Sequence, residues 1–154
     1  VLILNKIHFM RIATPFLYLY IILKLPVGES RSGQLFMAFL AGLLVDIFSN
    51  TPGMHAFACT LAGFFREEFI QMYMGKDLPE GIYPSYRVFG YSGFFRYVLT
   101  FVVLHHIALF LVESLTLFDP LFLAIRIVSS VLLTTLLICT AEAFNLIDIQ
   151  KIGE

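Results

Sequence analysis

Residues 42–66, GLLVDIFSNTPGMHAFACTLAGFFR, decide how this chain folds. They predict the end of one apolar helix, a tight polar turn at residues 49–53 and a second apolar helix, because Ser, Asn, Thr, Pro and Gly cluster in the turn. Asn50 or Thr51 is expected to cap the second helix, with Pro52 in its first turn, where a missing N–H is harmless. The two helices must therefore lie antiparallel and in contact.

Small side chains occur on both helices that flank this turn. They are Ala38, Ala41 and Gly42 on the first helix and Ala58, Ala62 and Gly63 on the second. In lipid, the packing of small residues takes the place of the hydrophobic force that associates helices in water. We therefore expect the two backbones to approach closely. A lone acid, Asp46, lies about one turn before the break.

The composition indicates an integral membrane protein. Of the 154 residues, 59% are apolar and 14% are charged, whereas a soluble domain has about 45–50% apolar and about 25% charged residues. Ten Lys and Arg residues against eleven Asp and Glu residues leave no basic field for a nucleic acid. The apolar excess must face something apolar, and a lipid bilayer provides that surrounding.

Apolar stretches divide the chain into helices. They cover residues 12–25, 34–49, 52–74, 94–118 and 120–146, and residues 1–4 are expected to be the tail of a first helix whose beginning is missing. The polar segment 75–93 must lie outside the hydrocarbon, because irregular backbone cannot cross lipid unsatisfied. The sequence thus predicts an all-α integral membrane protein, a single domain over residues 1–154 with about six transmembrane helices, the first truncated.

The distribution of Lys and Arg predicts the orientation in the membrane. One set of loops holds Lys24, Arg31, Arg66, Lys76, Arg87, Arg96 and Lys151, whereas the other set holds Lys6 and Arg11. The first set is expected in the cytoplasm. With six crossings, both termini are then cytoplasmic.

Two ionisable residues flank the turn at residues 119–120. Glu113 lies about five residues before this turn and Arg126 about six after it, so at a rise of about 1.5 Å per residue both lie at a similar depth. A charge at bilayer depth costs about 2.5–3.5 kcal/mol and needs a partner. We predict a Glu113–Arg126 ion pair, with Asp46 as the competing partner; the alternative interpretation is a proton or ion relay.

Histidines are the other polar residues expected inside the membrane. His105 and His106 predict either a metal or proton site, or a packing pair with one ring bonded to a neighbouring helix. Neither CxxC nor HExxH spacing accompanies them, which favours packing and no metal. His55 is expected at the interface in a first helical turn, and Glu142 close to water at a membrane exit. No nucleophile–base pair is evident, so we predict no enzyme and no cofactor.

The pattern formed by Gly42, Asp46, Gly53 and Ala56 resembles the rod shape-determining protein MreD family, in the form found in Bacteroidetes. The resemblance extends to LILNKIHF (2–9), TPFLYLYIILKLP (14–26), PSYRVFGYSGFFRY (84–97) and LHHIALFLVE (104–113). It covers nearly the whole chain, although most of the first helix of the family is absent.

The resemblance implies a non-catalytic scaffold of the cell-elongation machinery in the bacterial inner membrane, which supports peptidoglycan synthesis. The implied partners are MreC, RodA, a class B penicillin-binding protein and, indirectly, the MreB filament. A fold similar to the substrate-binding subunits of energy-coupling-factor transporters is implied as well. A second hypothesis is a small-ligand-binding transporter subunit, which would need a pocket where Asp46, His55, Glu113 and Arg126 converge.

Two surfaces are candidates for partner binding. The aromatic segment 83–97 carries Arg87, Tyr91 and Arg96, which indicate either a cytoplasmic docking site or an interfacial aromatic belt with snorkelling cations. The turns at residues 50–55 and 116–120 are expected to receive the membrane-anchored region of a partner such as MreC.

Overall fold

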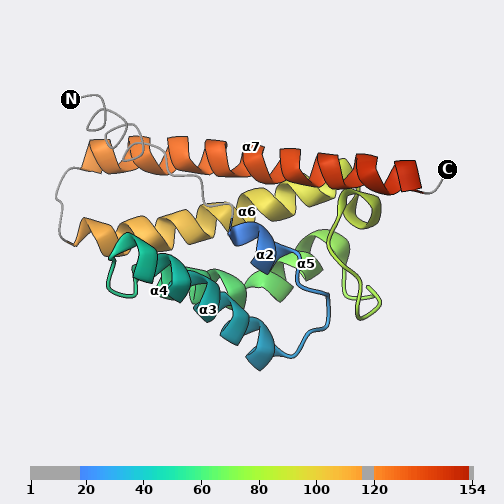
Figure 1. The fold of residues 1–154 in the computed structure, drawn as a ribbon, viewed down its shortest axis with the longest axis horizontal. Helices are drawn as coiled ribbons and strands as arrows, with labels where there is room; N and C mark the ends of the chain where they lie inside the picture. Colours follow the sequence, from blue (N-terminus) through green and yellow to red (C-terminus); the bar gives the residue numbers. More distant parts are fainter. Residues whose placement is uncertain (1–17, 116–119, 153–154) are drawn as a thin grey trace.

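The computed structural model describes residues 18–115 and 120–152, and within these ranges it is helical without strands (Figure 1). In chain order the helices are α2 (Leu19–Leu23), α3 (Arg31–Ser49), α4 (Met54–Phe64), α5 (Arg66–Met74), α6 (Tyr86–Ser114) and α7 (Pro120–Ile152). The predicted helix at residues 1–4 lies outside the described residues, as do residues 12–17 of the predicted helix 12–25, whose described part holds α2.

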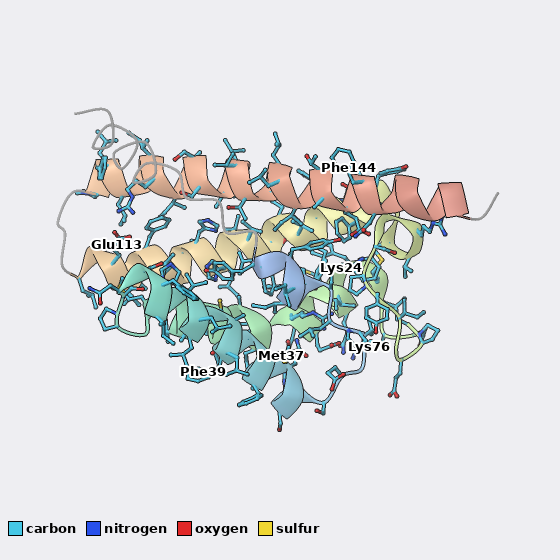
Figure 2. All side chains as sticks on the ribbon, viewed as in Figure 1. Lys24, Met37, Phe39, Lys76, Glu113 and Phe144 are labelled. Atoms are coloured by element: carbon cyan, nitrogen blue, oxygen red, sulfur yellow. The ribbon has the colours of Figure 1, made fainter. Side chains whose placement is uncertain are left out.

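Three helices of the described ranges are long and apolar enough to cross a membrane. They are α3, α6 and the Pro120–Asn145 part of α7. Large apolar side chains on them are exposed, and Phe39 and Phe144 point away from opposite sides of the bundle (Figure 2). Such extensive exposed apolar surface fits a lipid surrounding, in agreement with the membrane class that the composition predicts.

The helices form two antiparallel pairs around a common core. The long helices α6 and α7 lie side by side, and the shorter hairpin of α3 and α4 packs on α6 through α4 (Figure 1). We call the end with residues 50–53 the hairpin end, where α6 also finishes and α7 begins. The opposite end, with residues 75–85, is the loop end.

The backbones of α3 and α4 meet at Gly42. A Cβ atom on this glycine would lie 2.4 Å from the carbonyl oxygen of His55 and 2.5 Å from the Cα of Ala56. Further along the same contact, a Cβ on Gly63 would lie 2.9 Å from the Cβ of Ala38. The predicted close approach of small residues across the hairpin is confirmed.

Replacing Gly42 by Ala is expected to lower the free energy of unfolding by about 2 kcal/mol, because overpacking of a tight contact typically costs about 1–3 kcal/mol. The methyl group would collide with backbone, so the two helices would have to move apart. Equilibrium unfolding in mixed micelles of detergent and dodecyl sulfate measures this change.

Gly93→Ala is the matched control for this substitution. Its new Cβ would also lie 2.4 Å from an atom, but that atom is Cε at the tip of the Met74 side chain. A flexible tip moves at little cost, so we expect the control to change the free energy of unfolding by less than about 1 kcal/mol. Equal losses in both variants would contradict the proposed backbone collision at Gly42.

The prediction of one continuous helix over residues 52–74 is wrong. Phe65 (φ −89°, ψ 1°) separates two helices, α4 and α5. Directly after the break, the side chain of Arg66 is fully buried. Its Nη2 donates to two carbonyl oxygens at the C-terminal end of α2, those of Leu23 (3.4 Å) and Leu25. The guanidinium thus binds carbonyl oxygens at the C-terminal end of α2, where backbone acceptors have no partner within the helix.

Two helices begin earlier than predicted because serines cap them. The Ser30 hydroxyl accepts a hydrogen bond from the amide of Gly33 (3.2 Å), and α3 starts at Arg31 rather than at residue 34. Ser85 likewise accepts from the amide of Val88 (3.4 Å), so the second half of the predicted loop 75–93 is helical. The kink after this first turn of α6 falls at Gly90, whose φ of 67° suits glycine.

The loop end is held together by backbone pairing. The amide of Val27 donates to the carbonyl oxygen of Ile82, the amide of Gly81 donates to the carbonyl oxygen of Val27, and both distances are 2.8 Å. The connection between α2 and α3 is thereby joined to the connection between α5 and α6.

Candidate functional site

The carboxylate of Asp46 lies at the junction of α3 and α4 and is buried, with 3% of the side chain exposed. It accepts hydrogen bonds from the hydroxyl of Thr51 (2.6 Å) and from the backbone amides of His55 (3.0 Å) and Ala56 (2.9 Å). The Nδ1 atom of His55 lies 2.9 Å from the same carboxylate. One acidic side chain thus binds donors from the turn and from the next helix.

These contacts make Asp46 the N-terminal cap of α4. The residue in the ordinary cap position is Gly53, which has φ 74° and offers no side chain. The first amides of a helix are unpaired and carry the positive end of its dipole, so a carboxylate from the preceding helix stabilises them. The prediction that Asn50 or Thr51 caps this helix is wrong, and Pro52 lies before it.

A second buried polar group extends from His55 toward α6. The ring of Tyr18 packs edge-on against those of His55 and His105, with centroids 6.4 and 5.9 Å apart. Its hydroxyl lies 3.1 Å from Nε2 of His105, whose Nδ1 is 4.0 Å from the thiol sulfur of Cys59. His55 lies in the first turn of α4, as predicted, and is buried there. His105 bonds to a neighbouring element, as the packing interpretation predicts.

His106 has a different role from its neighbour. Its Nδ1 lies 2.8 Å from the carbonyl oxygen of Val102, one turn earlier in α6. Because a carbonyl only accepts, Nδ1 must carry the proton. Among the described residues, no cluster of three or more His, Cys, Asp and Glu side chains has a geometry that could hold a metal ion.

The predicted ion pair between Glu113 and Arg126 is confirmed. Nη1 of Arg126 donates to Oε1 of Glu113 at 2.7 Å, joining α6 to α7 near the hairpin end. The guanidinium also lies over the ring of Phe110, 4.8 Å from its centroid. Asp46, the predicted competing partner, instead binds the first amides of α4.

We expect Glu113→Gln and Arg126→Gln each to lower the free energy of unfolding by about 1 kcal/mol, because both side chains keep some exposure, 23% and 13%. The double variant should lose less than the sum of the two, since each single change already removes the pair. A double-mutant cycle measured by equilibrium unfolding tests this. Strict additivity would mean that the pair contributes nothing.

The sequence interpretation missed another ion pair, at the loop end, whose acid is buried. Nζ of Lys24 lies 3.1 Å from Oε2 of Glu142 and donates to the carbonyl oxygen of Pro84 at 2.7 Å. The hydroxyl of Tyr20 also donates to Glu142, at 2.6 Å. Glu142 is 3% exposed, so the prediction that it meets water is wrong. The pair joins the α2 region to α7.

The four polar groups of the ligand-binding hypothesis do not converge. Asp46 binds His55, and Glu113 binds Arg126, as two separate pairs. The cavity beside Asp46 has a volume of about 380 Å³ and is lined by Asp46, Ile47, Asn50, Thr51 and Pro52. Three of the four groups are absent from its lining, so this arrangement offers little for recognising a small polar ligand.

The predicted docking residues lie on a helix rather than in a loop. Arg87, Tyr91 and Arg96 belong to the first turns of α6 and are exposed, Tyr91 by 69%. The turn at residues 50–53 is largely exposed as well, whereas residues 116–119 lie outside the described ranges.

Comparison with protein-family models, with curated proteins and with solved structures found no match to this chain.

Proposed function

We propose that this chain is a non-catalytic scaffold of the rod-shape, cell-elongation machinery in the bacterial inner membrane, of the MreD type. The observation that carries the proposal is the common location of the four positions on which the resemblance rests. Gly42, Asp46, Gly53 and Ala56 all meet at one junction between α3 and α4.

Each of these positions has a structural role at the junction. Gly42 lets the backbones touch, Asp46 binds the amide of Ala56, and Gly53 takes the left-handed conformation that starts α4. A pattern that fixes how two membrane helices pack is what a scaffold needs, because its task is to present a fixed helical surface to other helices.

The remaining polar residues support a scaffold in the same way. The ion pairs Glu113–Arg126 and Lys24–Glu142 use side chains from different helices and so join them. The outward faces of the spanning helices stay apolar and available to partners, for which we propose MreC, RodA and a class B penicillin-binding protein. Six crossings, cytoplasmic termini and the transporter-subunit fold are part of this proposal.

Affinity purification from gently solubilised membranes of the parent bacterium, followed by quantitative mass spectrometry, tests this function. We expect wild type to recover MreC and the wall synthases, and Asp46→Asn to recover less of them. Asp77→Asn, which changes an exposed loop residue, is the matched control and should behave as wild type. Recovery of an ATPase and coupling subunits, or of a tightly held small molecule, would instead favour a transporter subunit.

A further inference from the structure

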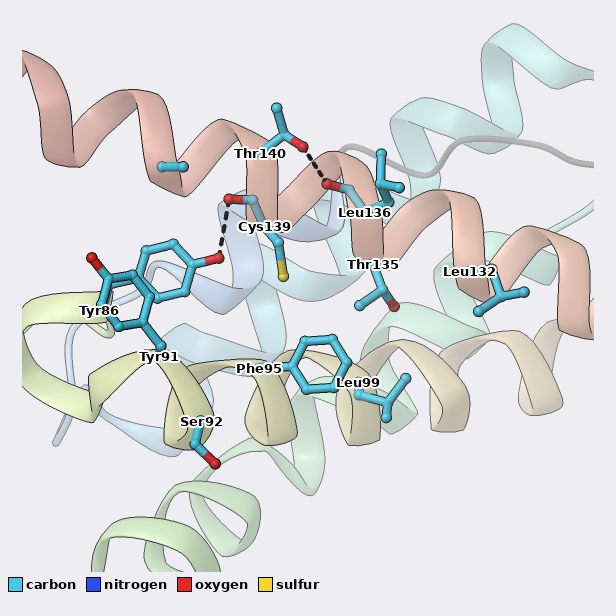
Figure 3. A pocket seen from close by; sticks show the side chains of 11 residues that line it. Tyr86, Tyr91, Ser92, Phe95, Leu99, Leu132, Thr135, Leu136, Cys139 and Thr140 are labelled. Carbon is cyan, nitrogen blue, oxygen red and sulfur yellow. Dashed lines mark hydrogen bonds between the residues drawn. The ribbon is translucent and has the colours of Figure 1, made fainter.

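A large apolar groove runs between α6 and α7 (Figure 3). Its volume is about 1020 Å³, and it is lined by Tyr86, Tyr91, Ser92, Phe95, Leu99, Leu132, Thr135, Leu136, Cys139, Thr140 and Ala143. Tyr91, Phe95, Leu132 and Leu136 are 47–69% exposed. The groove therefore opens to the surroundings of the bundle along rims of large apolar side chains.

Small side chains on α7 create the depth of this groove. Thr135, Cys139 and Ala143 follow one another at intervals of four residues and so share one face of the helix. Ser92 is the small residue on the α6 side. At the loop end, the hydroxyl of Tyr86 donates to the carbonyl oxygen of Cys139 (3.1 Å) and ties the two helices together.

One polar atom in the groove lacks a partner. Thr135 is 5% exposed, and its hydroxyl makes no hydrogen bond with any part of the chain that the structure describes. Its side chain extends from α7 toward Phe95 and Leu99 of α6 (Figure 3). The hydroxyl of Thr140, in the same groove, instead donates to the carbonyl oxygen of Leu136 at 2.7 Å.

The depth of Thr135 restricts what could satisfy it. Thr135 lies about three residues from the middle of the Pro120–Asn145 span, which is about 4 Å along the helix axis. Lipid ester and head groups lie about 15 Å from the bilayer centre, and acyl chains carry no hydrogen-bonding group. A polar side chain on another membrane helix can reach this depth.

We propose that the groove between α6 and α7 seats one transmembrane helix of a partner protein, which carries a hydrogen-bonding side chain near its middle to pair with Thr135. The inference rests on the proposed scaffold function and assigns its binding surface. Small residues along the floor allow the close backbone approach that associates helices in lipid. The exposed rims would then pack against the flanks of the incoming helix.

Photo-crosslinking in native membranes tests the groove with the full chain. A benzophenone amino acid is placed at Leu136, on the groove rim, or at Val128, an exposed residue of α7 outside it. We expect adducts from Leu136 that map by mass spectrometry to the transmembrane segment of another protein, near a Ser, Thr, Asn or Gln. Val128 should give at least about five-fold less of this adduct.

Two pairs of variants test which features of the groove bind the partner helix. Thr135→Val keeps the shape and removes the hydroxyl, and should lower the Leu136 adduct about three- to ten-fold, as an interhelical hydrogen bond in lipid contributes about 0.6–1.4 kcal/mol. Thr60→Val should leave it unchanged, because that hydroxyl lies on α4, outside the groove, and donates to the carbonyl oxygen of Ala56 at 2.7 Å. Ala143→Phe, which fills the groove, should abolish the adduct, whereas Ala124→Phe on an exposed part of α7 should not.

Several outcomes would overturn the inference. It fails if the adducts contain only lipid or a second copy of this chain. It also fails if Leu136 and Val128 give equal yields, or if neither Thr135→Val nor Ala143→Phe changes the yield. If MreC co-purifies but crosslinks only outside the groove, the proposed function stands and the groove is not the binding site. If MreC does not co-purify while a groove-specific helix adduct forms, the groove is a helix-binding site and the proposed function fails.

Discussion

Replacing Asp46 by Ala is expected to lower the free energy of unfolding by about 3–5 kcal/mol. The substitution leaves two buried helix amides without an acceptor, and each unsatisfied buried group costs about 1–3 kcal/mol. It also removes one partner of the Thr51 hydroxyl, which keeps Nδ1 of His55 at 3.1 Å. Equilibrium unfolding in mixed micelles measures the loss. The thiol of buried Cys59 reports it through a fluorogenic maleimide in a Cys139→Ala background, since the chain has no Trp.

Two variants show whether the loss comes from capping. Asp46→Asn keeps one carbonyl oxygen as an acceptor and should fall between wild type and Asp46→Ala. Asp77→Ala, in an exposed loop, should change the free energy of unfolding by less than about 0.5 kcal/mol. An Asp46→Ala protein as stable as wild type would show that α4 begins without its carboxylate cap.

Replacing Lys24 by Met is expected to lower the free energy of unfolding by about 3 kcal/mol. Glu142 would keep its burial and the hydroxyl of Tyr20 but would lose its only cation among the described residues, and breaking a buried ion pair costs about 3–5 kcal/mol. We take the lower end because Lys24 keeps 23% of its side-chain exposure. The same unfolding titration measures the change.

Two further variants test whether the burial of the Lys24–Glu142 ion pair explains the loss. Adding Glu142→Gln to Lys24→Met should recover part of the loss, because no buried charge is then left unpaired. Arg31→Met breaks an ion pair with Glu68 whose side chains are about half exposed, 53% and 45%, and should cost no more than about 1 kcal/mol. Equal losses from Lys24→Met and Arg31→Met would refute the role assigned to burial.

The hairpin at residues 42–66 was predictable because its signals are local. Turn-forming residues mark the break, and small residues at helical spacing mark the contact surface. The Glu113–Arg126 pair followed from counting residues on either side of one turn, since helical rise fixes depth. Membrane class followed from composition alone.

The contacts that the sequence did not reveal join residues far apart in the chain. Lys24 and Glu142 are 118 positions apart, and nothing in either neighbourhood specifies that α2 ends beside α7. The sequence placed Arg66 among the loop cations, and no residue near it indicates that it binds the carbonyl oxygens of Leu23 and Leu25. Such partners depend on tertiary packing rather than on local propensity.

Other misses had local signals. Ser30 and Ser85 directly precede the helices that they cap, and an N-cap search would have moved both helix starts. The cap supplied by Asp46 was harder to foresee, because it lies on the preceding helix rather than in the cap position. Asp46 reaches the amide of Ala56 because the turn folds α4 back against α3, with the two backbones in contact at Gly42.

Cell shape after depletion is the measurement that tests the proposed scaffold function most directly. The chromosomal copy in the parent bacterium is placed under a repressible promoter, and cell length and width are followed by microscopy. We predict that rods become round as the protein is depleted, and that wild type and Asp77→Ala restore them whereas Asp46→Ala does not. Depleted cells that keep their rod shape and instead lose uptake of a small nutrient would contradict the scaffold and favour a transporter subunit.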